Sequence, residues 1–179
     1  MGFLDKVKAA FTGPEVDIAE EIAKVDPGHQ VVGHARVVAS AFERGGGVAS
    51  GPNRLLGKAV EAASTAASGA RHVGGDEGTV ARDLPRAADL HVLVLSDLGL
   101  SLWDFGMTGT STPPDHVASV PRASVASITD TGKKAQGGVT MARVSFTDGS
   151  FFDYRIMEKP DTAFWAAVDR FEGLSQGLS

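Results

Sequence analysis

The chain has 179 residues, of which 42% are hydrophobic and 22% are charged, a composition typical of one soluble globular domain with or without appendages. The formal net charge is −5 and cysteine is absent, which excludes disulfides and sulfur-ligated metal sites and argues against a nucleic-acid partner, because phosphates would repel the chain. No apolar stretch approaches the roughly 20 residues of a membrane-spanning helix, and the N-terminus lacks a signal-peptide pattern. We therefore expect a cytoplasmic protein, with the inner face of the membrane as the alternative location.

Residues 1–28 are predicted to form a helical extension of two short helices. The first covers residues 2–11, and its apolar face consists of Phe3, Leu4, Val7, Ala10 and Phe11. The second begins at Pro14 and ends at Asp26-Pro27-Gly28, with Ile18, Ile22 and Val25 at helical spacing. The first helix has two interpretations. Its apolar face packs on the domain or on another copy, or it lies in a membrane interface with Phe3, Leu4, Val7 and Phe11 as the anchors.

A first strand is predicted over residues 30–42, where side chains alternate with a period of two. Residues 43–89 interrupt this pattern as a Gly/Ala/Ser-rich insertion, with a helix of small residues at 55–71 and a loop at 72–77.

A hairpin follows over residues 90–106, in which Ser96-Asp97-Leu98-Gly99 supplies the turn. The apolar run at 90–95 is typical of a strand that is covered on both faces.

Further strands are predicted around residues 117–120, 125–128 and 139–147, with an exposed turn at 131–138 that carries Lys133 and Lys134. An Asp-Gly pair at 148–149 predicts a tight turn into a returning strand at 151–156. A final helix is capped by Pro160-Asp161, and its apolar face consists of Phe164, Trp165, Val168, Phe171 and Leu174. The predicted fold class is therefore mainly β (α+β).

Four phrases occur in order along the chain: Leu84-Pro85 before HVLVLSDLGLSLW, then VPRASVASI, VSFTDGSFFDY and the terminal FWAAVDRF. Together they resemble the bacterial pleckstrin-homology-like (PH-like) domains, of the actinobacterial type with a glycine-rich insertion after the first strand. The resemblance covers about residues 30–174. It implies a PH-like barrel of two packed antiparallel sheets with a C-terminal plug helix, over residues 29–179, preceded by the two N-terminal helices. It also implies a binding or assembly scaffold, and it makes self-association an expectation because some members form ring-like homo-oligomers.

The sequence offers no complete catalytic or ligand-binding motif. The segment GPNRLLGKA at 51–59 differs from a phosphate-binding loop by one extra residue between its glycines and by Ala59 at the hydroxyl position. The five histidines lack metal-ligand spacing, and no serine lies in a GxSxG elbow. A turn role accounts for Asp97 and Asp148. We therefore predict no enzyme activity, no cofactor and no metal site.

Three functional hypotheses follow. The leading one is a non-enzymatic PH-like module that engages protein partners and copies of itself. The second is a peripheral membrane module anchored by the N-terminal amphipathic helix, and the third is a small-molecule-binding or hydrolytic protein with a site at the insertion. Lys133 and Lys134 are the candidate surface contact, although two exposed lysines add only about 1 kcal/mol each at an anionic surface, so specific headgroup recognition is not expected.

Overall fold

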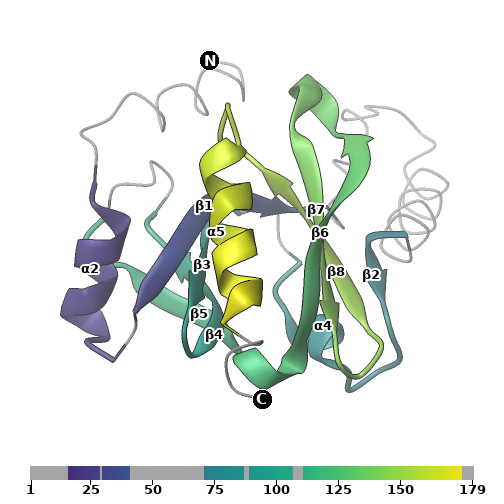
Figure 1. The fold of residues 1–179 in the computed structure, drawn as a ribbon, viewed down its shortest axis with the longest axis horizontal. Coiled ribbons are helices and arrows are strands. Elements are labelled where there is room, and N and C mark those ends of the chain that lie inside the picture. The colour runs from purple at the N-terminus through teal and green to yellow at the C-terminus, as the bar shows by residue number, and fades with distance from the viewer. Residues whose placement is uncertain (1–15, 29, 41–70, 87–88, 107–110, 175–179) are drawn as a thin grey trace, which may run out of the picture.

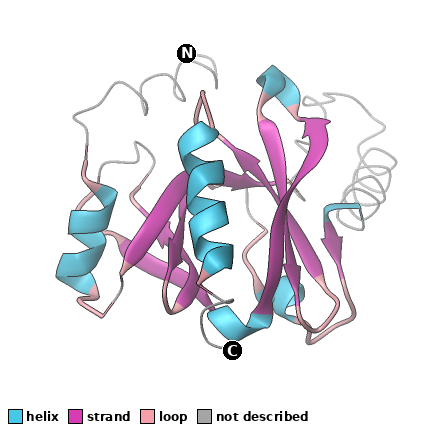
Figure 2. Ribbon diagram, viewed as in Figure 1, coloured by secondary structure: helices cyan, strands magenta, loops and turns pink. Residues whose placement is uncertain are grey.

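The computed structural model of the protein describes residues 16–28, 30–40, 71–86, 89–106 and 111–174. Its helices are α2 (Ile18–Val25), α4 (Val80–Asp83) and α5 (Thr162–Gly173), with short 3-10 segments η1 (Arg122–Ser124) and η2 (Gln136–Gly138). Its strands are β1 (Val31–Ala39), β2 (Val73–Gly74), β3 (His91–Ser96), β4 (Gly99–Asp104), β5 (Asp115–Pro121), β6 (Val125–Lys134), β7 (Thr140–Phe146) and β8 (Phe151–Ile156). The predicted class, mainly β with a C-terminal helix, is confirmed (Figure 2).

The strands form one open antiparallel sheet in the order β5-β4-β3-β1-β8-β7-β6, and β2 adds to β8. Two meanders, β3-β4-β5 and β6-β7-β8, are joined because β1 pairs with β3 on one side and with β8 on the other. The resemblance to PH-like domains implies two packed sheets, whereas the described strands belong to a single hydrogen-bonded sheet. Helix α5 lies in front of the middle of this sheet and packs against β1 and β3 (Figure 1).

The hairpin predicted over residues 90–106 is confirmed as β3 and β4, and Gly99 in its turn has a φ of 144°, a conformation that favours glycine. Every residue of β3 is buried. One face contributes Leu93 and Leu95 to the main core, and the other contributes Val92 and Val94 to a second cluster under α2. The predicted coverage of both faces is therefore confirmed, with α2 as the second cover.

Helix α2 begins later than predicted. The second helix is predicted to begin at Pro14, but residues 16 and 17 are not helical and the helix begins at Ile18. Asp17 is the reason, because its carboxylate accepts a hydrogen bond from the Glu20 N–H at 3.0 Å and so caps the helix. Ile18 and Ile22 then point into the second cluster, as their helical spacing requires.

The C-terminal part of the predicted insertion belongs to the fold. The loop predicted at 72–77 is wrong, because Val73 and Gly74 form β2 and pair with Phe152 and Phe151 of β8. Val73 and also Leu84, which follows α4, are buried in the main core. Residues 43–70 of the insertion, including the segment at 51–59, lie outside the described residues.

Two C-terminal predictions also need correction. Strand β6 continues to Lys134, so the predicted turn at 131–138 shrinks to η2 at its end. On α5, Leu174 is 43% exposed instead of buried, since it follows the last helical turn. Asp161 makes no capping bond to the helix backbone, and its carboxylate accepts a hydrogen bond from the Trp165 indole N–H.

Helix α4 is attached to the β7-β8 turn through Asp148. Its carboxylate accepts hydrogen bonds from the Ser150 hydroxyl at 2.6 Å and from the Val80 N–H at 2.8 Å. The Ser150 side chain, followed by the Val80 N–H, holds the pKa of Asp148 below its usual value.

A pH-dependent loss of stability follows from Asp148. A carboxyl whose pKa is lower in the folded state stabilises the fold above its unfolded pKa of about 3.9, and this contribution is lost as the pH falls through the lowered value. We expect Asp148→Asn to lower the urea midpoint at pH 7, with the difference from the parent protein fading below about pH 4. Asp169→Asn, an exposed site on α5, is the control. A difference that persists unchanged at pH 2 to 3 would contradict the assignment.

Tyr154 carries a buried hydroxyl with no hydrogen-bond partner among the described residues. Its ring is 1% exposed and stacks on Phe152 at 4.7 Å, and burial raises the pKa of the hydroxyl well above its usual range. A buried polar group without a partner is unfavourable, so Tyr154→Phe should raise the free energy of unfolding by about 1 kcal/mol in urea titrations. A loss of stability in this variant would show that the hydroxyl does bond inside the core.

Candidate functional site

The most elaborate polar arrangement among the described residues is centred on Asp153 of β8. Asp153 alternates with the core residues Phe152 and Tyr154, so it lies on the opposite face of the sheet from the main core. Its side chain is only 3% exposed. A buried carboxylate of this kind is costly unless positive partners compensate it.

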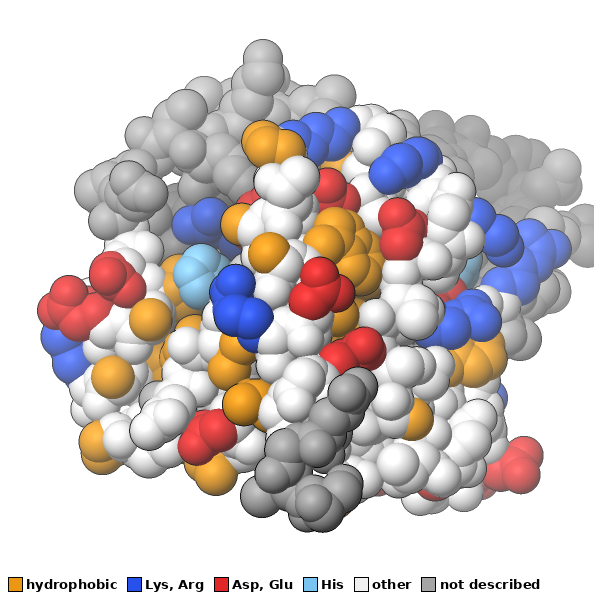
Figure 3. Space-filling view, viewed as in Figure 1, with side chains coloured by type: hydrophobic (Ala, Val, Ile, Leu, Met, Phe, Trp, Pro, Cys, Tyr) orange, Lys and Arg blue, Asp and Glu red, His pale blue; other side chains and the backbone are white. Residues whose placement is uncertain are grey.

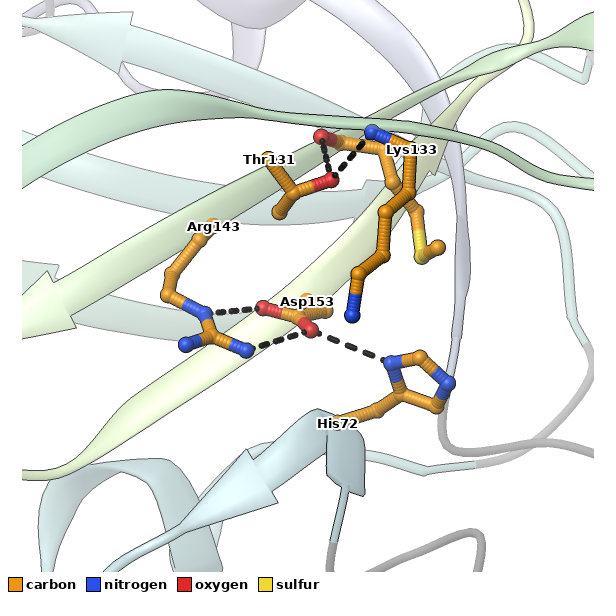
Figure 4. A network of polar contacts seen from close by, with 6 residues as sticks. His72, Thr131, Lys133, Arg143 and Asp153 are labelled. Atoms are coloured by element: carbon orange, nitrogen blue, oxygen red, sulfur yellow. Dashed lines mark hydrogen bonds and ion pairs between the residues drawn. The ribbon is translucent and has the colours of Figure 1, made fainter.

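Two side chains supply that compensation. Arg143 of β7 donates from Nε to Asp153 Oδ1 at 2.8 Å and from Nη2 to Oδ2 at 3.0 Å, a two-point contact that fixes the plane of the guanidinium. The Arg143 guanidinium also lies 3.7 Å from the centroid of the Phe151 ring. His72 completes the group, because its Nδ1 lies 3.1 Å from Asp153 Oδ2, where it must carry the proton to donate to a carboxylate (Figure 4).

A bulge in β6 brings the side chain of Lys133 to this group (Figure 4). Asp130 pairs with Ala142 and Lys134 pairs with Thr140, so four steps along β6 match only two along β7. Gly132 takes a φ of 70° inside the bulge, which a residue with a side chain rarely adopts. The Thr131 hydroxyl fixes the bulge by donating to the Met141 carbonyl and accepting from the Lys133 N–H.

The bulge directs the Lys133 side chain over the sheet face, where it points toward Asp153 and His72 (Figure 4). We call the four residues His72, Lys133, Arg143 and Asp153 the Asp153 cluster. Blue side chains gather on the right-hand side of the space-filling view, on the side where Figure 1 shows β6, β7 and β8 (Figure 3). With a neutral histidine, two positive charges face one negative charge, so the Asp153 cluster carries a net charge of +1 on a chain whose formal charge is −5.

The predicted lysine pair does not act as one patch. Lys134, unlike Lys133, donates from Nζ to the Thr140 hydroxyl at 2.7 Å. The Thr140 side chain in turn hydrogen-bonds Asp161 at the start of α5, and this contact is the main reason that the pKa of Asp161 is lowered. The two adjacent lysines therefore serve opposite faces of the sheet. The other predicted contact residues, Phe3, Leu4, Val7 and Phe11, lie outside the described residues.

A shallow depression of about 560 Å³ lies in the described end of the insertion. Charged side chains dominate its lining, among them Asp76, Glu77, Arg82, Asp83 and Arg86. Small-molecule pockets are usually lined by apolar and aromatic side chains, so this depression does not have the usual character of such a pocket.

Two further observations concern the described ranges. They contain no group of three or more His, Asp or Glu residues placed to hold a metal ion. No helix within them has the length and apolar character needed to cross a membrane.

Sequence reasoning does not identify Asp153, Arg143 or His72. Alternation places Arg143 and Asp153 on polar positions of their strands, but their pairing depends on the register of the hairpin. His72 lies in the predicted loop at 72–77, and nothing local indicates that it reaches β8. No protein-family model and no curated protein sequence matches the chain.

Proposed function

We propose that this chain is a non-enzymatic PH-like module that binds proteins, copies of itself included, through the open edges of its sheet. The PH-like part of the proposal is supported by the antiparallel strand pairing and by the C-terminal helix α5, whose apolar side is buried in the main core. The observation that carries the binding part is the edge strand β5, which pairs only with β4 among the described strands.

The two edges differ in how far they are covered. At β6, the Glu172 carboxylate of α5 accepts a hydrogen bond from the Ile128 N–H, and Arg122 donates to the carbonyls of Val125 and Phe171. Beside β5 no described element lies in the sheet. An uncovered edge strand presents unpaired N–H and C=O groups to any extended chain, and natural proteins usually protect such edges.

The side chains of β5 suit pairing with a second copy. Val117 is an extra residue in a bulge, since Leu102 pairs with Ala118 and Trp103 with His116, and it is 38% exposed. Residues 117–121 carry no charge. In an antiparallel pair of two β5 strands centred on Ala118, Asp115 would face Pro121, so no like charges would oppose each other.

Light scattering of the full chain at tens of micromolar tests this proposal. We expect a species larger than a monomer, reduced to a monomer by Val117→Lys, because a lysine on an edge strand opposes pairing. Val25→Lys is the matched control, since Val25 is similarly exposed, at 45%, but lies on α2. A strictly monomeric parent protein, or an equal effect of both substitutions, would reject self-association through β5.

A further inference from the structure

We propose that Lys133 and Arg143 in the Asp153 cluster bind a carboxylate of an acidic, extended segment of a protein partner. This inference rests on the proposed binding role and names the chemistry of the partner. It uses the outer face of the β6-β7-β8 half of the sheet, away from β5. Three observations carry it: a fixed arginine, a lysine directed by a bulge, and the charge of the cluster.

The arginine is preorganised to bind an anion. Asp153 holds its Nε and Nη2 atoms, and the Phe151 ring covers one face of the guanidinium. The Nη1 atom has no hydrogen bond to the described residues, and the side chain of Arg143 is 36% exposed. A guanidinium that is already immobilised loses little conformational entropy when it binds an anion, which favours specific recognition over diffuse attraction.

A β-bulge in β6 brings the lysine to the same face. This bulge interrupts two regular positions of the β6-β7 pairing. Without the bulge at Thr131–Lys133, β6 would continue its pairing with β7 from Asp130 to its end. Bulges are known to redirect side chains at functional sites. The Thr131 hydroxyl makes the two hydrogen bonds that fix this bulge. Lys133 Nζ has no ion pair or hydrogen bond with the described residues. Lys133 is therefore available to an external acceptor.

The charge of the Asp153 cluster selects a carboxylate. A net charge of +1, which already includes the charge of Asp153, is neutralised by one carboxylate, whereas a phosphate dianion would leave a net charge of −1. The chain as a whole carries −5, so an acidic ligand gains attraction from a local basic site such as this one and not from the overall charge. The segment lies on the outer face of the β6-β7-β8 half and not along the β6 edge, because Glu172 of this chain already accepts the Ile128 N–H there at 2.9 Å.

The experiment measures binding of a fluorescent hexaglutamate peptide to the full chain at low salt, with a hexaglutamine peptide as the neutral reference. We expect binding of hexaglutamate only, and a loss of about tenfold in affinity for Lys133→Glu. Lys134→Glu makes the same charge change at the neighbouring residue on the opposite face and should lose less affinity than Lys133→Glu, with a wider gap between the two variants at about 0.15 M salt, where screening shortens the reach of the charge. Thermal melts of both variants show whether each one is folded.

Four outcomes would overturn the inference. Hexaglutamate does not bind, or hexaglutamine binds equally well. Alternatively, the two lysine variants lose equal affinity for hexaglutamate, or inorganic phosphate competes with the peptide more strongly than free glutamate does. Vesicles containing phosphatidylserine form a further arm: Lys133-dependent binding to vesicles without binding to the peptide would assign the site to a lipid surface and reject the acidic segment.

The peptide assay does not require self-association. A monomer that binds hexaglutamate supports this inference while rejecting pairing through β5, and a self-associating chain that ignores hexaglutamate does the reverse.

Discussion

Gly33→Ala should destabilise the protein by about 3 kcal/mol, which is large against the total stability of a domain of this size. Gly33 lies in β1 where α5 crosses the strand. A Cβ atom placed there would lie 2.2 Å from the Cβ of Ala167, and the Ala167 Cα would follow at 3.6 Å. Neither neighbour can move by rotating a side chain, because both atoms are fixed to the helix backbone. The clash can be relieved only if α5 moves away from the sheet.

That displacement would affect more than one contact. Phe164, Val168 and Phe171 of α5 are buried in the main core, and Arg170 donates to the Val32 carbonyl beside Gly33. Urea titration should therefore show a lower midpoint, and near-ultraviolet circular dichroism should show weaker packing of the aromatic residues. Gly173→Ala, at the last residue of the same helix, meets no atom within 4 Å and is the control. Equal stability of the two variants would contradict the close approach of α5 to β1.

The sequence predicts the elements well where local chemistry determines them. Strand alternation, the Asp97–Gly99 turn and the apolar run of β3 each depend on nearby residues, and the structure confirms all three. Long-range pairing is where prediction from sequence fails. Val73 and Gly74 are too short a segment to show a period, and they form a strand only because β8 offers its edge where β1 has ended. The single sheet likewise follows from β1 pairing on both sides.

The Asp153 cluster illustrates the same limit in one hairpin. A two-residue Asp-Gly turn at 148–149 would place Arg143 opposite Tyr154. The Phe146 N–H instead donates to the Ser150 carbonyl, so the turn contains three residues and Gly149 has a φ of 84°. This change of one residue puts Arg143 opposite Asp153. The bulge that directs Lys133 depends in the same way on register, which local composition does not determine.

Arg143→Met should destabilise the protein by about 3 kcal/mol, because it leaves the Asp153 carboxylate buried with His72 as its remaining side-chain partner. This value is at the lower end of the range for breaking a buried ion pair, since the arginine itself is 36% exposed. Methionine keeps much of the aliphatic length, so lost packing on Phe151 is a smaller contribution. Urea titration at pH 7 gives the change in the free energy of unfolding.

The double variant Arg143→Met/Asp153→Asn separates electrostatics from packing. Removing the carboxylate charge as well should restore at least about half of the lost stability, because an amide is far less costly to bury than an unpaired carboxylate. Arg170→Met is the control, since Arg170 is exposed and makes one hydrogen bond to the neutral Val32 carbonyl, and it should cost about 1 kcal/mol or less. If the double variant is as unstable as Arg143→Met, or if Arg170→Met costs as much, the buried charge of Asp153 is not what Arg143 compensates.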